Sequence, residues 1–226
     1  VIVGEDGASL TYVASKEKAC RSVGMLSSVY RLSAKSTEED VLKTIDFLNN
    51  DPEIDGYIVQ LPLPQGVKAP KIKPYWDVDG FGSEANHTAC TPGGIIDYLD
   101  AAGFDYEGKL AVIIGRSEIV GKPMAKLLLD KNCTTAVVHS KTPVETKKYL
   151  LSEADLVVCA VGRAGFLDPM DCPDAFIVDV GINFDENGKL VGDVLPKSKD
   201  RVTPVPGGVG LLTRLKLMKN TIDCYL

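Results

Sequence analysis

A tyrosine and a lysine spaced for one helix face are the first residues whose types could do chemistry together. Tyr12 and Lys16 are four residues apart, so in a helix their side chains lie on the same face. A lysine beside a phenol can act as a general acid or base if desolvation favours the neutral amine. The same spacing suits a solvated lysine on an amphipathic helix, so the spacing alone leaves both interpretations open.

A glutamine follows a short apolar run at a point where regular pairing must stop. Gln60 comes directly after Tyr57-Ile58-Val59, and Pro62 and Pro64 close behind it prevent further ladder hydrogen bonds. The carboxyl end of a parallel strand is a usual place for ligand contacts in α/β proteins. A glutamine at this point can contact a ligand or act as a capping amide.

Two aspartates lie in the long irregular connection of the chain, residues 65–91, and such connections are often functional. Asp77-Val78-Asp79-Gly80 could bind a metal or the adjacent N–H groups of a heterocycle, or form a plain aspartate turn. No second acidic cluster exists in the sequence to complete a metal site, so we expect no bound metal.

An apolar run that ends in a glycine turn predicts a nucleotide site. Val112-Ile113-Ile114 leads into Gly115-Arg116-Ser117, and a helical pattern begins near Met124. In a strand–turn–helix unit of this kind, the amides at the helix N-terminus face a phosphate. Ser117 replaces the usual second glycine, and a purely structural turn of an α/β domain is the alternative.

The turn after the next apolar run indicates which dinucleotide binds. Ala136-Val137-Val138 is followed by His139-Ser140-Lys141, where NAD sites usually carry an acid for the ribose 2′-hydroxyl. Arg116, Ser140 and Lys141 instead offer positive charge and hydrogen-bond donors. We therefore predict NADP rather than NAD as the cofactor.

Composition excludes several other classes of protein. The net charge of −6 argues against nucleic acid or an anionic membrane as the main partner, and no apolar run approaches the ~20 residues of a membrane span. The six scattered cysteines indicate reduced, mostly buried thiols in the cytoplasm or an organelle matrix. With two histidines, a histidine-rich metal site or a Ser-His-Asp triad has little support. Val1 opens directly on a strand-like run, so we expect a further element upstream.

Helical and strand patterns alternate along the chain, which predicts an α/β protein with largely parallel sheets. Helices are expected at Thr11–Val23, after a capping box of Ser36 and Glu39, at about Pro92–Ala102, and at Gly210–Asp223. Strands are expected at Val1–Val3, Leu26–Leu32, Tyr57–Val59, the run ending at Ile114, Ala136–Val138, Leu156–Ala160 and Phe176–Val180, with an edge hairpin at Gly188–Val194.

Read in order, seven motifs resemble the bifunctional methylenetetrahydrofolate dehydrogenase/cyclohydrolase family from Gly4 to the C-terminus. They are Tyr12-Val13-x-Ser15-Lys16-x-Lys18-Ala19-Cys20, Val59-Gln60-Leu61-Pro62-Leu63-Pro64, Asp77-Val78-Asp79-Gly80-Phe81, Cys90-Thr91-Pro92-x-Gly94-Ile95, Gly115-Arg116-Ser117-x-Ile119-Val120-Gly121-x-Pro123, Asp179-Val180-Gly181-Ile182-Asn183 and Thr203-Pro204-Val205-Pro206-Gly207-Gly208-Val209-Gly210. The connections 64–77 and 81–90 are shorter than in the family, and Leu211-Leu212-Thr213 replaces Pro-Met-Thr.

The resemblance implies two α/β domains with a cleft between them. Residues 1–92 with 207–226 form a folate-binding catalytic domain, and residues 93–206 form a Rossmann-type NADP-binding domain. The resemblance further implies that methylenetetrahydrofolate is oxidised by NADP, and that water opens the methenyl product to 10-formyltetrahydrofolate, a one-carbon donor for purine biosynthesis. The resemblance also implies a homodimer.

By matched position, the resemblance implies a role for each site residue. Lys16 is the central acid/base, Tyr12 orients the folate and assists Lys16, and Gln60 bonds the lysine and adjusts its basicity. Asp79 binds the pterin ring. The remaining folate contacts are expected at Val59, Leu61, Pro206, Gly207, Gly208 and Val209. The NADP contacts are expected at Gly115, Arg116, Ser117 and Ser140, with Ile182 at the nicotinamide end.

Two other functions are compatible with the same fold. One is a dehydrogenase without cyclohydrolase activity, and the other is a non-catalytic NADP- or folate-binding regulatory module. The presence of Lys16, Gln60 and Asp79 argues against both.

Overall fold

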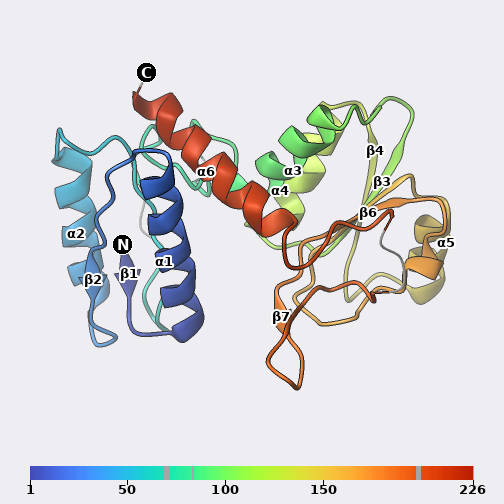
Figure 1. Ribbon diagram of the computed structural model, residues 1–226, viewed down its shortest axis with the longest axis horizontal. Coiled ribbons are helices and arrows are strands. Elements are labelled where there is room, and N and C mark those ends of the chain that lie inside the picture. Colours follow the sequence, from blue (N-terminus) through green and yellow to red (C-terminus); the bar gives the residue numbers. More distant parts are fainter. Residues whose placement is uncertain (69–71, 83, 197–199, 226) are drawn as a thin grey trace. The chain divides into compact units, whose positions relative to one another are not determined.

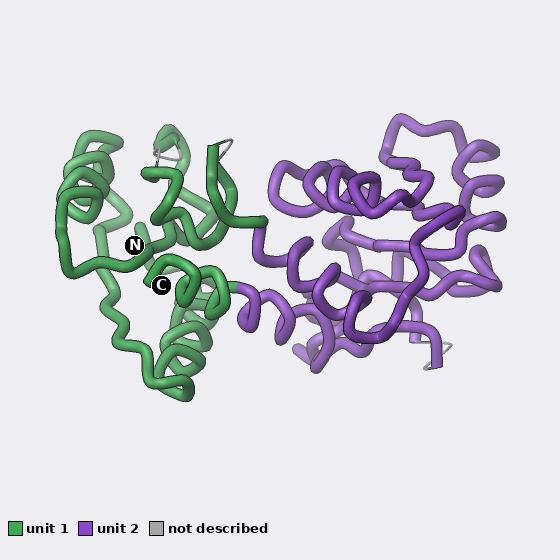
Figure 2. The backbone as a smooth tube through the Cα atoms, turned by 90° about the horizontal axis from the view of Figure 1, so that it is seen from above, with its two compact units in different colours: residues 1–88, 217–226 green, residues 89–216 purple. Residues whose placement is uncertain are grey.

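The chain forms two compact units, each with its own core. The computed structural model describes residues 1–68, 72–82, 84–196 and 200–225 (Figure 1). Unit 1 comprises residues 1–88 and 217–226, and unit 2 comprises residues 89–216 (Figure 2). Residues 207–216 therefore pack with unit 2, although the sequence prediction assigned them to the folate domain. The predicted functional domain bounds stay a prediction.

Unit 1 has two helices beside a two-stranded parallel sheet. Its elements are β1 (Ile2–Val3), α1 (Gly7–Ser22), β2 (Arg31–Leu32) and α2 (Glu38–Asn50), joined by the end of α6 (Val209–Tyr225). The apolar positions of α2 recur at helical spacing and are buried against β1 and the segment after residue 56. This core contains Val3, Val41, Ile45, Leu48, Tyr57 and Val59.

The helix starts in unit 1 differ from those predicted. Asp6 caps α1, accepting from Ser9 N at 2.8 Å, so the helix begins four residues before Thr11. The capping box of α2 pairs Thr37 with Asp40 and not Ser36 with Glu39. The observed box begins one residue later than the predicted one, and Thr37 has the extended backbone that an N-cap requires.

Two strand predictions in unit 1 were too long. The predicted strand at 26–32 pairs only at Arg31 and Leu32, because β1 offers it two residues. Tyr57 forms a single bridge with Asp77, and its neighbours bond to Val1, through Ile58 O and Gln60 N, without a continuous ladder. A segment forms a strand only where a neighbouring strand can pair with it, and the local sequence pattern does not show whether one is present. Positions 69–71 and 83 of the predicted irregular connection lie outside the described residues.

Unit 2 is a parallel four-stranded sheet covered on both faces. The strand order is β4 (Thr134–Val138), β3 (Leu110–Ile114), β5 (Leu156–Cys159) and β6 (Phe176–Asp179). Crossover elements are α4 (Gly121–Asp130), α5 (Val144–Ser152) and the 3₁₀ turn Pro169–Asp171, and α3 (Cys90–Ala101) precedes the sheet. An antiparallel pair, β7 (Asn183–Phe184) and β8 (Leu190–Val191), follows β6 as a separate sheet, and it begins five residues before the hairpin predicted at Gly188–Val194. The predicted α/β class with a parallel sheet is confirmed.

Alternation along β3 explains the two cores of unit 2. Ile113 faces α3 and α4, in a cluster with Ile95, Met124 and Leu128. Val112 and Ile114 face the opposite way, in a cluster with Leu151 of α5. Since both faces are buried, the strand must be continuously apolar, as its sequence is. All six cysteines are free, and five are buried.

In residues 1–68, 72–82, 84–196 and 200–225, no helix combines the length and the apolar composition needed to cross a bilayer.

A matched pair of valines tests this layered core. Val112 is 0% exposed in the centre of the sheet, whereas Val137 on the edge strand β4 is 38% exposed. Val112→Ala removes two buried methyl groups and leaves a cavity, so the free energy of unfolding should fall by about 2 kcal/mol or more. Val137→Ala should cost less than about half of that. Chemical denaturation measures both, and equal losses would contradict the assigned core.

Candidate active site

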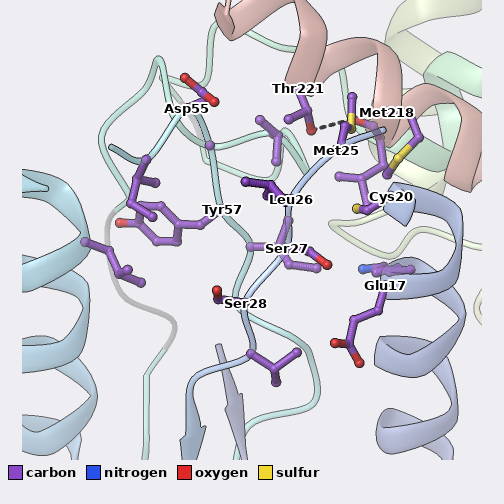
Figure 3. Close-up of a pocket in the computed structure, with 18 of the residues that line it drawn as sticks. Glu17, Cys20, Met25, Leu26, Ser27, Ser28, Asp55, Tyr57, Met218 and Thr221 are labelled. Carbon is purple, nitrogen blue, oxygen red and sulfur yellow. Dashed lines mark hydrogen bonds between the residues drawn. The ribbon is translucent and has the colours of Figure 1, made fainter. Parts of the chain in front are cut away.

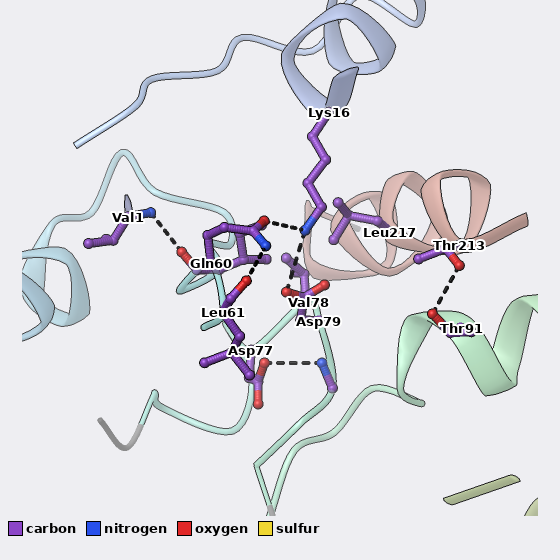
Figure 4. A network of polar contacts seen from close by, with 12 residues as sticks. Val1, Lys16, Gln60, Leu61, Asp77, Val78, Asp79, Thr91, Thr213 and Leu217 are labelled. Carbon is purple, nitrogen blue, oxygen red and sulfur yellow. Dashed lines mark hydrogen bonds and ion pairs between the residues drawn. The ribbon is translucent and has the colours of Figure 1, made fainter. Parts of the chain in front are cut away.

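The ammonium group of Lys16 lies between an amide and a carboxylate (Figure 4). Helix α1 projects the side chain inward, where it is 16% exposed. Its Nζ donates to Gln60 Oε1 at 3.3 Å and lies 3.7 Å from Asp79 Oδ2. Three residues from separate parts of the sequence therefore meet at one nitrogen atom, and the interpretation of Lys16 as a simply solvated lysine is wrong.

Gln60 is oriented by its own backbone surroundings. Its Nε2 donates to Leu61 O at 2.8 Å, which turns Oε1 toward Lys16. Its backbone N donates to Val1 O at 2.9 Å, so the residue continues the pairing around β1. The side-chain amide of Gln60 therefore does two things: its oxygen accepts from Lys16, and its nitrogen donates to the backbone.

The turn that carries Asp79 is held from two sides. The Asp77 carboxylate accepts from Gly80 N at 3.0 Å and Gly82 N at 2.7 Å, which closes the turn. From α6, Asn220 Nδ2 donates to Val78 O at 2.9 Å and to Thr88 O at 3.0 Å. Asp77, Asp79 and Asn220 are all buried. Sequence reasoning missed Asn220, because a polar residue in a C-terminal helix carries no local signal of its contacts.

Tyr12 lies one turn before Lys16 on α1, as the spacing predicts. Its side chain is half-buried, with 39% of the residue exposed. Burial raises the pKa of the phenol above its usual value, so Tyr12 stays protonated at neutral pH and can donate a hydrogen bond.

A cavity of about 790 Å³ opens in unit 1 beside this cluster (Figure 3). It reaches Lys16 and Gln60 and extends between α1, the segment 23–30 and α6. Neither Tyr12 nor Asp79 lines it. The cavity therefore shares Lys16 and Gln60 with the predicted folate contacts, but not Tyr12 or Asp79.

In unit 2 the sheet register brings the predicted cofactor residues to one edge. Ile114 pairs with Val138 and Cys159, and Cys159 pairs with Asp179, so the four parallel strands end level. The segments that follow them therefore share the carboxyl edge of the sheet, where dinucleotides bind in open α/β folds. These segments contain Gly115, Arg116, Ser117, Ser140 and Ile182.

The turn after β3 packs its backbone more closely against neighbouring carbonyls than any residue with a Cβ would allow. Gly115 adopts φ +117°, and a Cβ there would collide with Ala160 O. A Cβ at Gly121 would collide with Gly115 O, so both glycines are required for the tight turn into α4. Ser117 Oγ accepts from Val120 N at 3.2 Å and Gly121 N at 3.3 Å, and its hydroxyl hydrogen can still donate. These residues fit the phosphate chain of a dinucleotide.

The turn after β4 suits a 2′-phosphate. Thr142 Oγ1 accepts from His139 N at 3.0 Å, and His139 Nδ1 accepts from Lys141 N at 3.1 Å. This closed turn leaves the Ser140 and Lys141 side chains exposed, as is Arg116. No acid stands directly after the strand, so nothing here would repel a phosphate.

The remaining predicted folate contacts divide between the two units. Val59 and Leu61 flank Gln60 in unit 1, and Val59 is buried in its core. Residues 206–209 belong to unit 2, where they form the turn into α6 and Val209 joins the core. Among the described side chains, no group of three or more His, Cys, Asp or Glu is arranged to hold a metal ion.

The parallel sheet with its glycine turn, together with a buried lysine site, defines a dinucleotide-binding α/β enzyme. Two family models match the chain: the tetrahydrofolate dehydrogenase/cyclohydrolase catalytic domain over residues 1–79, and the NAD(P)-binding domain of the same family over residues 89–226. The chain belongs to the tetrahydrofolate dehydrogenase/cyclohydrolase family.

Individual relatives agree with this assignment. The bifunctional protein FolD of Staphylococcus haemolyticus is 45% identical over 240 residues, covering 98% of this chain and 84% of that protein. The crystal structure of the bifunctional enzyme FolD from Campylobacter jejuni superposes with a TM-score of 0.92 at 40% identity, over 99% of this chain and 85% of that one.

A third relative was solved with ligands. The Trypanosoma brucei methylenetetrahydrofolate dehydrogenase-cyclohydrolase, in complex with NADP and an inhibitor, has a TM-score of 0.90 at 33% identity, over 99% of this chain and 84% of that one. The predicted family is thus confirmed. The chain is an NADP-dependent methylenetetrahydrofolate dehydrogenase and methenyltetrahydrofolate cyclohydrolase of one-carbon metabolism.

The exposed arginine after β3 provides a test of cofactor choice. A charge-assisted hydrogen bond contributes roughly 1.5–3 kcal/mol, so Arg116→Ala should lower kcat/KM for NADP about 10- to 150-fold. The value for NAD should change little, because NAD has no 2′-phosphate. Lys126→Ala, at an exposed position of α4, is the control. Steady-state kinetics with both cofactors decides, and equal losses would mean that Arg116 only shapes the turn.

Proposed function

We propose that unit 1 binds the folate and that Lys16 is the acid/base of the hydrolytic reaction. The observation that carries this proposal is the position of Nζ, 3.3 Å from Gln60 Oε1 and 3.7 Å from Asp79 Oδ2. An ammonium has three N–H donors. Two of these N–H groups can point at Gln60 and Asp79. The third is then available to a substrate atom or a water molecule.

Hydrolysis requires a group that can both take and return a proton. As the oxygen of water bonds to the methenyl carbon, Lys16 in its amine form takes the proton released. As the bond from that carbon to N5 breaks, the ammonium form returns a proton to the nitrogen, and the remaining hydroxyl proton leaves to solvent as the formyl C=O forms. Gln60 is neutral and accepts from the lysine, so it holds Nζ in place through this cycle. Asp79 supplies the negative charge that balances the ammonium.

The oxidation depends on alignment more than on proton transfer. When bound, NADP accepts a hydride from the methylene carbon of the folate. The contribution of the chain is to hold the folate in place. We assign this to Asp79, whose carboxylate can accept from pterin N–H groups, and to the Tyr12 phenol. Val59 and Leu61, which flank Gln60, complete the proposed folate contacts of unit 1.

We extend the proposal to the cofactor contacts and to the setting of the enzyme. Gly115, Arg116, Ser117 and Ser140 hold the NADP phosphates, and Ile182 lies against the nicotinamide end. The functional domains are residues 1–92 with 207–226, and residues 93–206. The enzyme works as a homodimer in the cytoplasm, without nucleic acid or membrane as a partner. The family resemblance, the bacterial relatives and the net charge of −6 support these statements.

The two activities should separate when the lysine loses its proton-carrying nitrogen. Lys16→Met keeps an unbranched stem of similar length, so packing is largely retained. Methenyl hydrolysis should fall about 100-fold or more, the contribution of a positioned acid/base. NADPH formation should fall less. The matched control is Lys18→Met, at an exposed lysine on the same helix. Normal hydrolysis in Lys16→Met, followed by methenyl absorbance, would remove Lys16 from the mechanism.

Replacement of Asp79 should impair both reactions together, because it acts through folate binding. Asp79→Ala leaves pterin donors unpaired in a closed site, at a cost of roughly 1–3 kcal/mol or more. Asp79→Asn replaces an acceptor with a donor and should be nearly as harmful. Calorimetry with a folate analogue measures the affinity, with Asp46→Ala on α2 as the control. Unchanged affinity in Asp79→Ala would show that its role is confined to Lys16.

A further inference from the structure

Two buried aspartates join the segments that follow β5 and β6. Asp179 is the last residue of β6, and Asp193 follows β8; they are 3% and 0% exposed. The Asp179 carboxylate accepts from Gly181 N at 2.9 Å, Asp193 N at 2.9 Å and Val194 N at 3.0 Å. A chain of hydrogen bonds thus runs from the end of β6 to Asp193.

Asp193 is bound by three successive backbone N–H groups. Its Oδ2 accepts from Val161 N at 2.7 Å and Gly162 N at 2.9 Å, and its Oδ1 accepts from Arg163 N at 2.8 Å. Gly162 adopts φ +66°, which helps to turn the three groups toward one point. Consecutive N–H groups arranged in this way form a concave anion site, which in other proteins binds phosphate. In this chain a carboxylate of the protein fills it.

The same carboxylate also reaches the segment after β6. Asn183 Nδ2 donates to Asp193 Oδ1 at 2.9 Å. Ile182 therefore lies between Gly181, which is bonded to Asp179, and Asn183, which is bonded to Asp193. A Cβ at Gly181 would collide with Asp193, and one at Gly192 would collide with Asp179, so the backbone approaches both carboxylates closely.

We propose that Asp193 is a positioning residue for the nicotinamide end of NADP. Its carboxylate fixes the 161–163 segment and, through Asn183, the backbone that carries Ile182. Both segments lie at the carboxyl edge of the sheet, where the cofactor residues gather. Because the 161–163 anion site is filled from within, the cofactor phosphates bind at the β3–α4 turn. The inference rests on the proposed contact between Ile182 and the nicotinamide.

Asp193→Asn tests the inference at constant side-chain volume. The substitution removes the charge and points an amide donor at backbone donors, so the 161–163 segment must move. The dissociation constant for NADP by calorimetry, and KM for NADP, should rise about tenfold or more. Cyclohydrolase activity, assayed on the methenyl substrate without NADP, should stay within about twofold, because hydrolysis needs no hydride acceptor.

The control is an aspartate of the same hairpin with a comparable bonding pattern. The Asp185 carboxylate accepts from Asn187 N at 2.9 Å and Lys189 N at 2.8 Å, but it is partly exposed and contacts neither 161–163 nor Asn183 through these bonds. Asp185→Asn should leave NADP affinity and both activities near those of the parent. An equal loss of NADP affinity in both variants would overturn the proposal.

Other outcomes are equally decisive. Unchanged NADP affinity in Asp193→Asn, or a parallel fall of both activities, would overturn a positioning role. If Asp193→Asn fails to fold, Asn183→Ala provides the test, because it removes one of the four hydrogen-bond donors to the Asp193 carboxylate. It should raise the dissociation constant for NADP about threefold or more. No change in that constant would overturn the proposal. Ile182→Ala tests the underlying contact separately. Normal NADP affinity in Ile182→Ala, with loss in Asp193→Asn, would refute that contact while retaining the role of Asp193 in NADP binding.

Discussion

The level ends of four parallel strands are the constraint on which the cofactor site depends. Because β3 to β6 pair in parallel and in register, segments separated by more than sixty residues emerge at one edge of the sheet. Buried apolar faces on both sides of the sheet fix that register, since a slip of one residue would exchange the two cores. Arg116, Ser140 and Ile182 owe their common location to this packing and not to any direct contact.

Buried charge is handled differently in the two units. In unit 1 the Lys16 ammonium faces Gln60 and Asp79. The Lys16–Asp79 ion pair therefore lies beside the neutral amide of Gln60, and all three groups are partly shielded from solvent. In unit 2 the carboxylates of Asp179 and Asp193 are bonded to backbone N–H groups and the Asn183 amide. The first arrangement holds the nitrogen on which we propose that protons are exchanged. The second satisfies the charge with fixed donors, which suits rigid support.

Backbone geometry is as important as side chains at these sites. Gly115 and Gly121 permit a turn in which any Cβ would collide with a neighbouring carbonyl. Gly181 and Gly192 permit the close approach to the two buried aspartates. At these four positions a larger residue would displace the segments that carry the site, so glycine contributes to function through the space it leaves open.

The sequence by itself determined the fold class, the family, the cofactor and the spacing of Tyr12 and Lys16, because these depend on local pattern and ordered motifs. It also located most elements to within a few residues. Tertiary structure alone decided that Asp79 joins Gln60 at the Lys16 ammonium, that Tyr57 pairs at a single bridge, and that Asn220 and Asp193 bond the backbone segments beside them. Such contacts join residues up to 142 positions apart. Local propensity carries no information on them, since the energy that selects them arises only when the partners are packed together.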